Sequence, residues 1–129
     1  MQADEFGEVM ARAFHDDPVM AWLLPDGQGL ALMFTALSRH IHALTDVAHR
    51  DGDMVGGAVW DPPGFEGDLE AAIPVFVEAM GDAVDRGATL DEVMAAHRPK
   101  EPHWYLAQIG VAPELGGKGV GGELMRQGL

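Results

Sequence analysis

Apolar residues along the chain recur at helical spacing in three long stretches. These stretches cover residues 4–14, 28–44 and 69–84, and each places large apolar side chains three and four positions apart. Residues at this spacing share one face of a helix, so the pattern predicts three amphipathic helices that each bury one side. Thr89 and Glu92 form a capping box, which predicts a short further helix that ends near residue 97.

Three other segments have the composition of strands. Residues 46–50 and 54–60 flank the turn signal at residues 51–53, in which glycine supplies the positive φ that a tight hairpin needs. Two adjacent glycines at 56–57 predict a bulge in the second strand or the close approach of another group. Residues 104–111 are nearly all apolar, which predicts a buried central strand. We expect residues 1–129 to form a single domain.

The charge balance of the chain excludes some classes of partner. The formal net charge is −13, with only 8 lysines and arginines among 129 residues. Such a surface repels phosphate backbones, so we expect no binding to nucleic acid. It would raise the local concentration of a cationic amine, although solubility alone is a sufficient explanation of the charge.

The residue types that are missing narrow the picture further. The chain has no cysteine, so it forms neither disulfides nor thiolate metal sites, which fits a cytoplasmic location. No apolar run approaches the length of a membrane span, and the first residues lack the basic region of a signal peptide. No histidine and carboxylate spacing typical of a metal site is present, so we expect no metal. The composition, rich in glycine, alanine and aspartate, is typical of a bacterial source.

A glycine-rich segment lies between the apolar strand and the start of another helix. The segment runs from Gly116 to Gly122 and contains Lys118. Glycines allow backbone N–H groups to converge on an anion, and a helix start adds free donors, so a phosphate or pyrophosphate is the natural ligand. A nucleotide-binding P-loop is excluded, because Lys118 is followed by Gly119 and the position six residues before the lysine is Ala112.

Two other phosphate-binding patterns remain. The dinucleotide pattern is matched by Gly117, Gly119 and Gly122, but no acidic residue follows about 20 positions later. The acetyl-CoA pattern Q/R-x-x-G-x-G/A, after a strand that ends in Val-x-Pro, is matched by residues 109–113 and 116–121. Its first position is glycine here, which removes one side-chain anchor and leaves the backbone geometry intact.

Residues 103–125 resemble the core motif of the GNAT superfamily of N-acetyltransferases. The resemblance is closest to the puromycin N-acetyltransferase type, which has a similar connector to the one at residues 97–102. It implies an α+β fold, a mixed sheet flanked by helices, in which the chain stops before the family's C-terminal elements. Those elements are a further strand, a helix and a hairpin that usually carry a tyrosine acid, whereas Tyr105 lies on another strand.

The resemblance also implies a reaction and a set of binding residues. Acetyl would pass from acetyl-CoA, the co-substrate, to a primary amine of a small molecule. The pantetheine arm would pair with the backbone of Ile109 and Val111. Lys118 would contact a phosphate or point to solvent. The pyrophosphate would lie against the loop and the helix start, formed by Gly116, Gly117, Lys118, Gly119, Val120, Gly121 and Gly122.

Weaker candidates complete the sequence-based site. His103 precedes the apolar strand and is a candidate base, although a surface or capping function is the simpler explanation. Phe14, Trp22 and Trp60 are candidates to line an acceptor pocket, with core packing as the alternative. A shortened sheet would leave an open edge, which invites pairing with a second copy. The alternative function is therefore a non-catalytic remnant that binds CoA or forms a homodimer.

Overall fold

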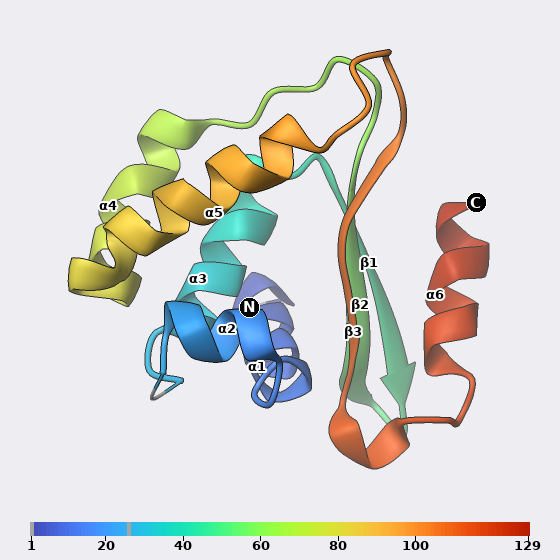
Figure 1. Cartoon of the computed structure of the whole chain (residues 1–129). Helices are drawn as coiled ribbons and strands as arrows, with labels where there is room; N and C mark the ends of the chain where they lie inside the picture. Colours follow the sequence, from blue (N-terminus) through green and yellow to red (C-terminus); the bar gives the residue numbers. More distant parts are fainter. Residues whose placement is uncertain (1, 26) are drawn as a thin grey trace.

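A three-stranded antiparallel sheet separates two unequal sets of helices (Figure 1). The computed structural model describes residues 2–25 and 27–129. The strands are β1 (Leu44–Arg50), β2 (Asp53–Asp61) and β3 (Tyr105–Val111). The helices are α1 (Gln2–Ala13), α2 (Pro18–Leu23), α3 (Leu30–Ala36), α4 (Leu69–Met80), α5 (Val84–Ala96) and α6 (Val120–Gly128). Helix α6 covers one face of the sheet, and the others lie on the opposite side.

The predicted hairpin is confirmed. Asp51 and Gly52 both have positive φ, at 54° and 86°, which is the two-residue turn whose twist matches that of the flanking strands. Strand β1 begins at Leu44, which the apolar pattern had assigned to the end of the second helix. That helix instead ends in a π turn at Leu37–Ile41, because Leu44 pairs with Trp60 in the sheet.

The position predicted for residues 104–111 in the sheet is wrong. Strand β2, not β3, is central, and it is buried from Met54 to Trp60. Strand β3 is an edge strand that is mostly half-buried. Its apolar composition reflects packing of both faces, against α1 on one side and α6 on the other. The described strands pair only antiparallel, so the parallel part of the expected mixed sheet is not among them.

Two glycines of β2 allow helices to approach the sheet from both sides. The register with β1 shifts between Ala48 and His49 and leaves Val55 unpaired, so a bulge lies directly before the predicted glycine pair. A Cβ at Gly56 would lie 3.1 Å from the Val120 side chain of α6, and a Cβ at Gly57 would collide with the Phe6 ring of α1. The close approach predicted from this glycine pair is therefore confirmed, and it is what seats α1 against the strand.

The third and fourth predicted helices have different boundaries in the structure. Helix α4 ends at Met80, where Gly81 adopts a φ of 52°. Helix α5 then runs without a break through Asp85, Thr89 and beyond. The predicted capping box is wrong, because the Thr89 hydroxyl donates to the Asp85 carbonyl oxygen at 3.1 Å, within the helix. Gly81 ends the helix because it supplies the positive φ that other residues rarely adopt.

The core divides into two clusters, one on each face of the sheet. The larger cluster joins α1, α3 and the sheet through the fully buried Phe6, Met10 and Phe34. The smaller joins α6 to the sheet through Trp60 and Leu124. Within the described ranges, no helix is both long and apolar enough to cross a membrane.

Candidate functional site

The outer edge of β3 presents backbone groups that the sheet does not use. The Ala112 N–H donates to the Val55 carbonyl oxygen at 2.7 Å, and this pair is one position beyond the pair of Gly56 with Val111 in the β2–β3 register. Hydrogen-bonded and non-hydrogen-bonded pairs alternate along antiparallel strands. Ile109 and Val111 are therefore in non-hydrogen-bonded pairs, and their N–H and C=O groups point outward. No described strand covers this edge.

The glycine loop after β3 has a backbone that requires glycine at two positions. Gly117 and Gly119 have φ values of 77° and 87°, and a Cβ at either one would meet open space. Glycine is thus needed there for conformation rather than for packing. Gly116 has an ordinary φ of −57°, so the backbone does not require glycine at the position where the acetyl-CoA pattern has Gln or Arg.

The loop leads directly into the free amides of α6. The Glu123 N–H donates to the Gly119 carbonyl oxygen at 3.1 Å, so it is the first amide of α6 with a helical partner, and the amides of Val120, Gly121 and Gly122 come before it. In the described part of the chain, no group accepts from these three amides. Lys118 is exposed beside them. Free donors, the positive end of the helix dipole and a lysine together make this helix start a candidate anion site.

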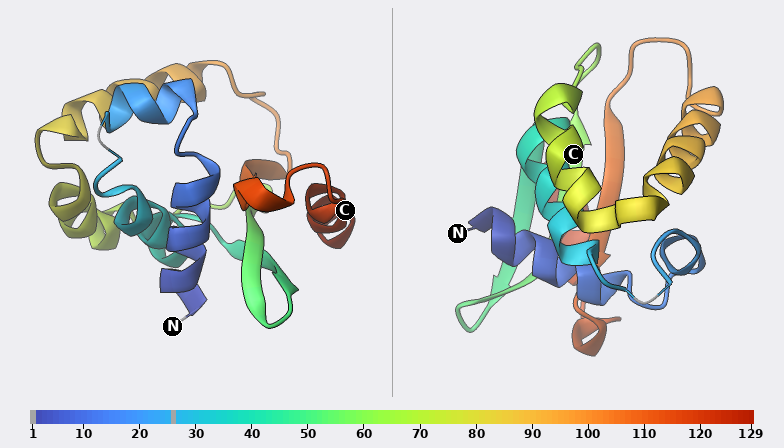
Figure 2. Two further views of the ribbon diagram at one scale, coloured as in Figure 1. Left: turned by 90° about the horizontal axis from the view of Figure 1, so that it is seen from below. Right: turned by 90° about the vertical axis from the view of Figure 1, so that its left-hand side faces the viewer.

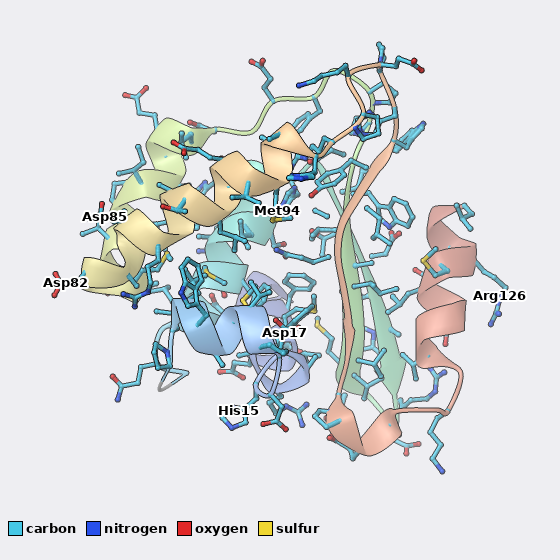
Figure 3. The ribbon with its side chains drawn as sticks, viewed as in Figure 1. His15, Asp17, Asp82, Asp85, Met94 and Arg126 are labelled. Carbon is cyan, nitrogen blue, oxygen red and sulfur yellow. The ribbon has the colours of Figure 1, made fainter. Side chains whose placement is uncertain are left out.

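Buried side chains hold α6 in this position. Val120 and Leu124 are fully buried against the sheet, while Arg126 projects away from it (Figure 3). The Glu123 carboxylate accepts from the Arg50 guanidinium of β1 at 2.6 Å. Because this arginine holds the carboxylate, the one acidic side chain in the first turn of α6 is neutralised close to the anion site.

The other end of β3 is bent by a bulge and borders a cavity. Val59 is paired with Gln108 and Trp60 with Leu106, so Ala107 is an extra residue in β3 that the ladder leaves unpaired. A cavity of about 460 Å³ lies beside it. In the right-hand view of Figure 2, α4 and α5 diverge from their common turn, and β3 is visible between them.

The cavity wall is mainly apolar and comes from elements distant in the sequence. Helices α2 to α5 contribute apolar side chains that include Met20, Leu23, Met33, Phe76, Met80 and Met94. Met94, labelled in Figure 3, projects from α5 into the space between the helices and β3. Tyr105, Ala107 and Gln108 line the β3 side. Ligand sites are commonly of this kind, apolar with a few polar groups.

A histidine and an aspartate form a pair at this cavity. The Nδ1 atom of His42 lies 2.9 Å from Oδ2 of Asp61, and their side chains are only 8% and 15% exposed. The other oxygen, Oδ1, accepts from the Ala43 N–H at 3.0 Å. His42 lines the cavity. Sequence reasoning missed this pair, since the two residues lie 19 positions apart and match no motif.

The weaker sequence candidates lie elsewhere. Phe14 stacks on Phe34 with 5.3 Å between ring centroids, Trp22 is half-exposed, and Trp60 is buried on the α6 side of the sheet. His103 has Nδ1 2.7 Å from the Glu101 carbonyl oxygen, and its buried Nε2 has no partner among the described residues. These candidates are absent from the cavity wall, and their contacts with a substrate stay predictions.

A separate hollow of about 400 Å³ lies between α1 and the turn after β3. There Arg12 donates to Glu114 at 2.9 Å. The backbone N–H of Glu114 itself, and then the Arg12 guanidinium, hold the pKa of the Glu114 carboxyl below its ordinary value of 4.5. No group of three or more potential metal ligands occurs in the described ranges.

The chain is similar to two solved acetyltransferase structures from bacteria. One, from Corynebacterium glutamicum, is described as histone acetyltransferase HPA2 and related acetyltransferase; it has a TM-score of 0.71 and 28% identity over 99% of this chain. The other is a GNAT family acetyltransferase from Brucella melitensis in complex with acetyl-CoA, with a TM-score of 0.53 and 18% identity over 98% of this chain.

These matches establish the fold of the chain but not its activity or its substrate. The chain spans 66% and 59% of the lengths of the two structures. No family model matches the chain. The predicted α+β class is confirmed, since the antiparallel sheet flanked by helices matches the fold of GNAT acetyltransferases.

Proposed function

We propose that the chain is a member of the GNAT superfamily that transfers acetyl from acetyl-CoA to a primary amine of a small molecule. The observation that carries the proposal is the continuity of the β3 edge with the anion site. The outward backbone groups of Ile109 and Val111 lead, within a few residues, to the free amides at the start of α6. The Brucella neighbour, a complex with acetyl-CoA, supports the identity of the ligand.

Acetyl-CoA has the two chemical parts that this surface would recognise. Its extended pantetheine arm carries amides that can add to an open strand edge as another strand would. Its pyrophosphate can accept from the amides of Gly119 to Gly122, with Lys118 beside them. Because Gly116 replaces the usual Gln or Arg, most of the affinity would come from backbone groups.

The cavity beside Ala107 is the proposed acceptor site. Its wall is mostly apolar, so we expect an amine carried on an aliphatic or aromatic body rather than a polyamine or an amino sugar. The net charge of −13 would favour the approach of a cationic amine. The sequence resemblance to the puromycin type suggests an aminonucleoside, whose base is an aromatic ring system.

Calorimetric titration with acetyl-CoA tests the proposal directly. We expect saturable binding, and release of free thiol that requires an added amine. Acetyl-pantetheine, which lacks the pyrophosphate, should bind at least about tenfold more weakly, a difference of about 1.4 kcal/mol. No binding at millimolar acetyl-CoA would contradict the proposal. Equal affinity for both compounds would contradict the assignment of the α6 amides to the pyrophosphate.

A second candidate function uses the same edge of β3. Because no described strand covers this edge, it could pair with a second copy of the chain to form a homodimer without catalysis. A dimer of this kind and the pantetheine arm would compete for the same backbone groups. Sedimentation velocity with and without acetyl-CoA separates the two, since the competition predicts that ligand dissociates the dimer. The cytoplasmic location and the bacterial source stay predictions.

A further inference from the structure

His42 is placed as a base would be. It follows the π turn at Leu37–Ile41, where the chain leaves the helical layer to enter β1. Its Nδ1 is engaged by the Asp61 carboxylate, which the Ala43 N–H fixes through the other oxygen. No described residue bonds to its Nε2, and the side chain lines the cavity. A carboxylate on Nδ1 holds the proton there and leaves Nε2 as the proton acceptor.

We propose that His42, oriented by Asp61, is the general base that removes the proton from the acceptor amine. The inference rests on the proposed function, because it assigns a residue to the acetyl transfer argued above. His42 is the catalytic residue, since Nε2 would touch the amine. Asp61 acts through His42 and is a positioning residue.

The other ionisable groups around the cavity are less suited to this function. Arg98 lies over the Tyr105 ring, 3.9 Å from its centroid, and a guanidinium accepts no proton. Asp91 is on an exposed part of α5, where water screens it. His103 is absent from the cavity wall. Among the titratable residues of the wall, His42, Asp91, Arg98 and Tyr105, only His42 combines a free acceptor nitrogen with burial.

Gln108 supplies a second polar contact for the amine. It lines the same cavity from β3, next to the unpaired Ala107. Its side-chain oxygen is buried and has no partner among the described residues. A buried acceptor without a donor is costly, and a ligand N–H would satisfy it. The amine nitrogen would then donate one hydrogen to Gln108 and direct another to His42.

The reaction balances with these groups and solvent. The neutral amine nitrogen forms a bond to the acetyl carbonyl carbon, and the carbon–sulfur bond breaks with its electron pair moving to sulfur. The proton that the nitrogen loses passes to Nε2 of His42. The thiolate takes a proton from water, and His42 later returns its proton to water. The products are the acetamide and free CoA, with no further reactant.

The test compares H42Q with H40Q in the full chain, using β-phenylethylamine as the acceptor; His40 lies in the neighbouring π turn but does not line the cavity. Because proton transfer by a positioned base contributes about 100-fold to 10,000-fold, H42Q should lower kcat by at least about 100-fold. The Kd for acetyl-CoA should stay within about twofold. H40Q should keep kcat within about threefold. For wild type, kcat should fall towards low pH, since a protonated imidazole accepts no proton; in H42Q only the fall caused by protonation of the amine should remain.

Two further measurements separate a base from a structural histidine. Imidazole added to H42A should restore kcat about tenfold or more, because it replaces the missing base. D61N should lower kcat less than H42Q while it leaves the acetyl-CoA Kd unchanged. Independently of any variant, the Nε2 nitrogen signal of His42 in wild type should shift when β-phenylethylamine is added in the presence of CoA.

Different results would overturn different parts. If H42Q keeps the kcat of the wild type, or if the amine does not shift the His42 nitrogen signal, the inference is overturned and the proposed function remains intact. A wild-type chain that binds acetyl-CoA but releases no thiol with β-phenylethylamine overturns the inference and leaves coenzyme binding intact. A chain that binds no acetyl-CoA overturns the proposed function itself.

Discussion

The two ends of β3 present different kinds of chemical groups to a ligand. At its C-terminal end, which we call the coenzyme end, recognition would depend on the backbone: the outward groups of Ile109 and Val111 and the amides that begin α6. At its N-terminal end, which we call the cavity end, the residues beyond the bulge at Ala107 are surrounded by side chains from α2 to α5 and by His42. One short strand therefore joins a surface that needs particular backbone angles to a cavity that needs particular side chains.

Under the proposed function, this difference explains how one scaffold could keep its coenzyme and change its acceptor. Backbone groups are present whatever the side chains are, so substitutions that preserve the fold and the loop glycines preserve the coenzyme surface. The cavity wall has no such protection, because each lining side chain can be exchanged separately. We therefore expect substitutions at the two ends to act on different kinetic constants, unless they alter the strand that supports both.

The largest effect is expected at Gly57, where β2 supports both ends. A Cβ at this position collides with the fully buried Phe6 ring, so Gly57→Val should lower the free energy of unfolding by about 3 kcal/mol. Urea unfolding measures this loss. Gly116→Ala is the control, because Gly116 has an ordinary φ and a Cβ there would have no contact shorter than 3.4 Å; it should change stability by less than about 0.5 kcal/mol.

A proline in place of Val111 would test whether the coenzyme end binds through its backbone. The Val111 N–H points away from β2, so Val111→Pro removes a donor without breaking the described ladder. One lost amide hydrogen bond of about 1.5 kcal/mol would raise the Kd for acetyl-CoA about tenfold. Val111→Ala shortens the same side chain but keeps the N–H, and it should change the Kd less than about threefold. Equal Kd values for the two variants, measured by calorimetry, would show that this N–H does not meet the coenzyme.

Two adjacent residues of α5 allow a controlled test of the cavity end. Met94 and Val93 are similarly exposed, at 42% and 52%, but only Met94 lines the cavity. Met94→Lys removes apolar contact and places a cation near the amine, so the KM for β-phenylethylamine should rise about tenfold, or about 1.4 kcal/mol. Val93→Lys should leave it unchanged, and neither should alter the acetyl-CoA Kd. An equal rise in KM for both would place the acceptor outside this cavity.

The local structure of the proposed coenzyme end was predictable from the sequence because its parts are consecutive. The strand, the glycine loop and the start of α6 lie within residues 105–128, and glycine at positions 117 and 119 reflects the positive φ that the loop requires. The hairpin turn at residues 51–52 was predictable for the same reason. Such signals depend on local backbone geometry, which a short stretch of sequence specifies.

The cavity end was not predictable, because it is assembled by packing. His42 and Asp61 meet only after β1 pairs with β2 and brings Ala43 beside Asp61. Residues 104–111 were expected to be central because an apolar run shows that both faces of a strand are covered, but it does not show whether both edges are paired. The α4–α5 boundary was missed because two glycines, Gly81 and Gly87, could each end a helix, and only the structure shows that Gly81 adopts the positive φ.

The smallest predicted effect concerns Glu114, beside the coenzyme end. Its own backbone N–H and then Arg12 keep its pKa below 4.5, so folding favours the ionised form. The resulting stability is fully present above the pKa of the unfolded chain and is lost as the pH falls through the lower pKa of the folded chain. Both side chains are more than half exposed, so water and salt weaken the pair.

Arg12→Ala should raise the pKa of Glu114 only part of the way to 4.5, because the larger contribution comes from the backbone N–H. A carbon-13 titration of the Glu114 carboxyl, repeated in high salt, measures both the shift and its screening. The control is Arg39→Ala, which breaks a similarly exposed pair with Asp4 and should leave Glu114 unchanged. A complete return to 4.5 in Arg12→Ala would mean that the guanidinium, not the backbone, sets the ionisation of Glu114. The charge of Glu114, in the turn between β3 and the glycine loop, would then be set by a side chain. That result would contradict the view that backbone groups determine the properties of the coenzyme end.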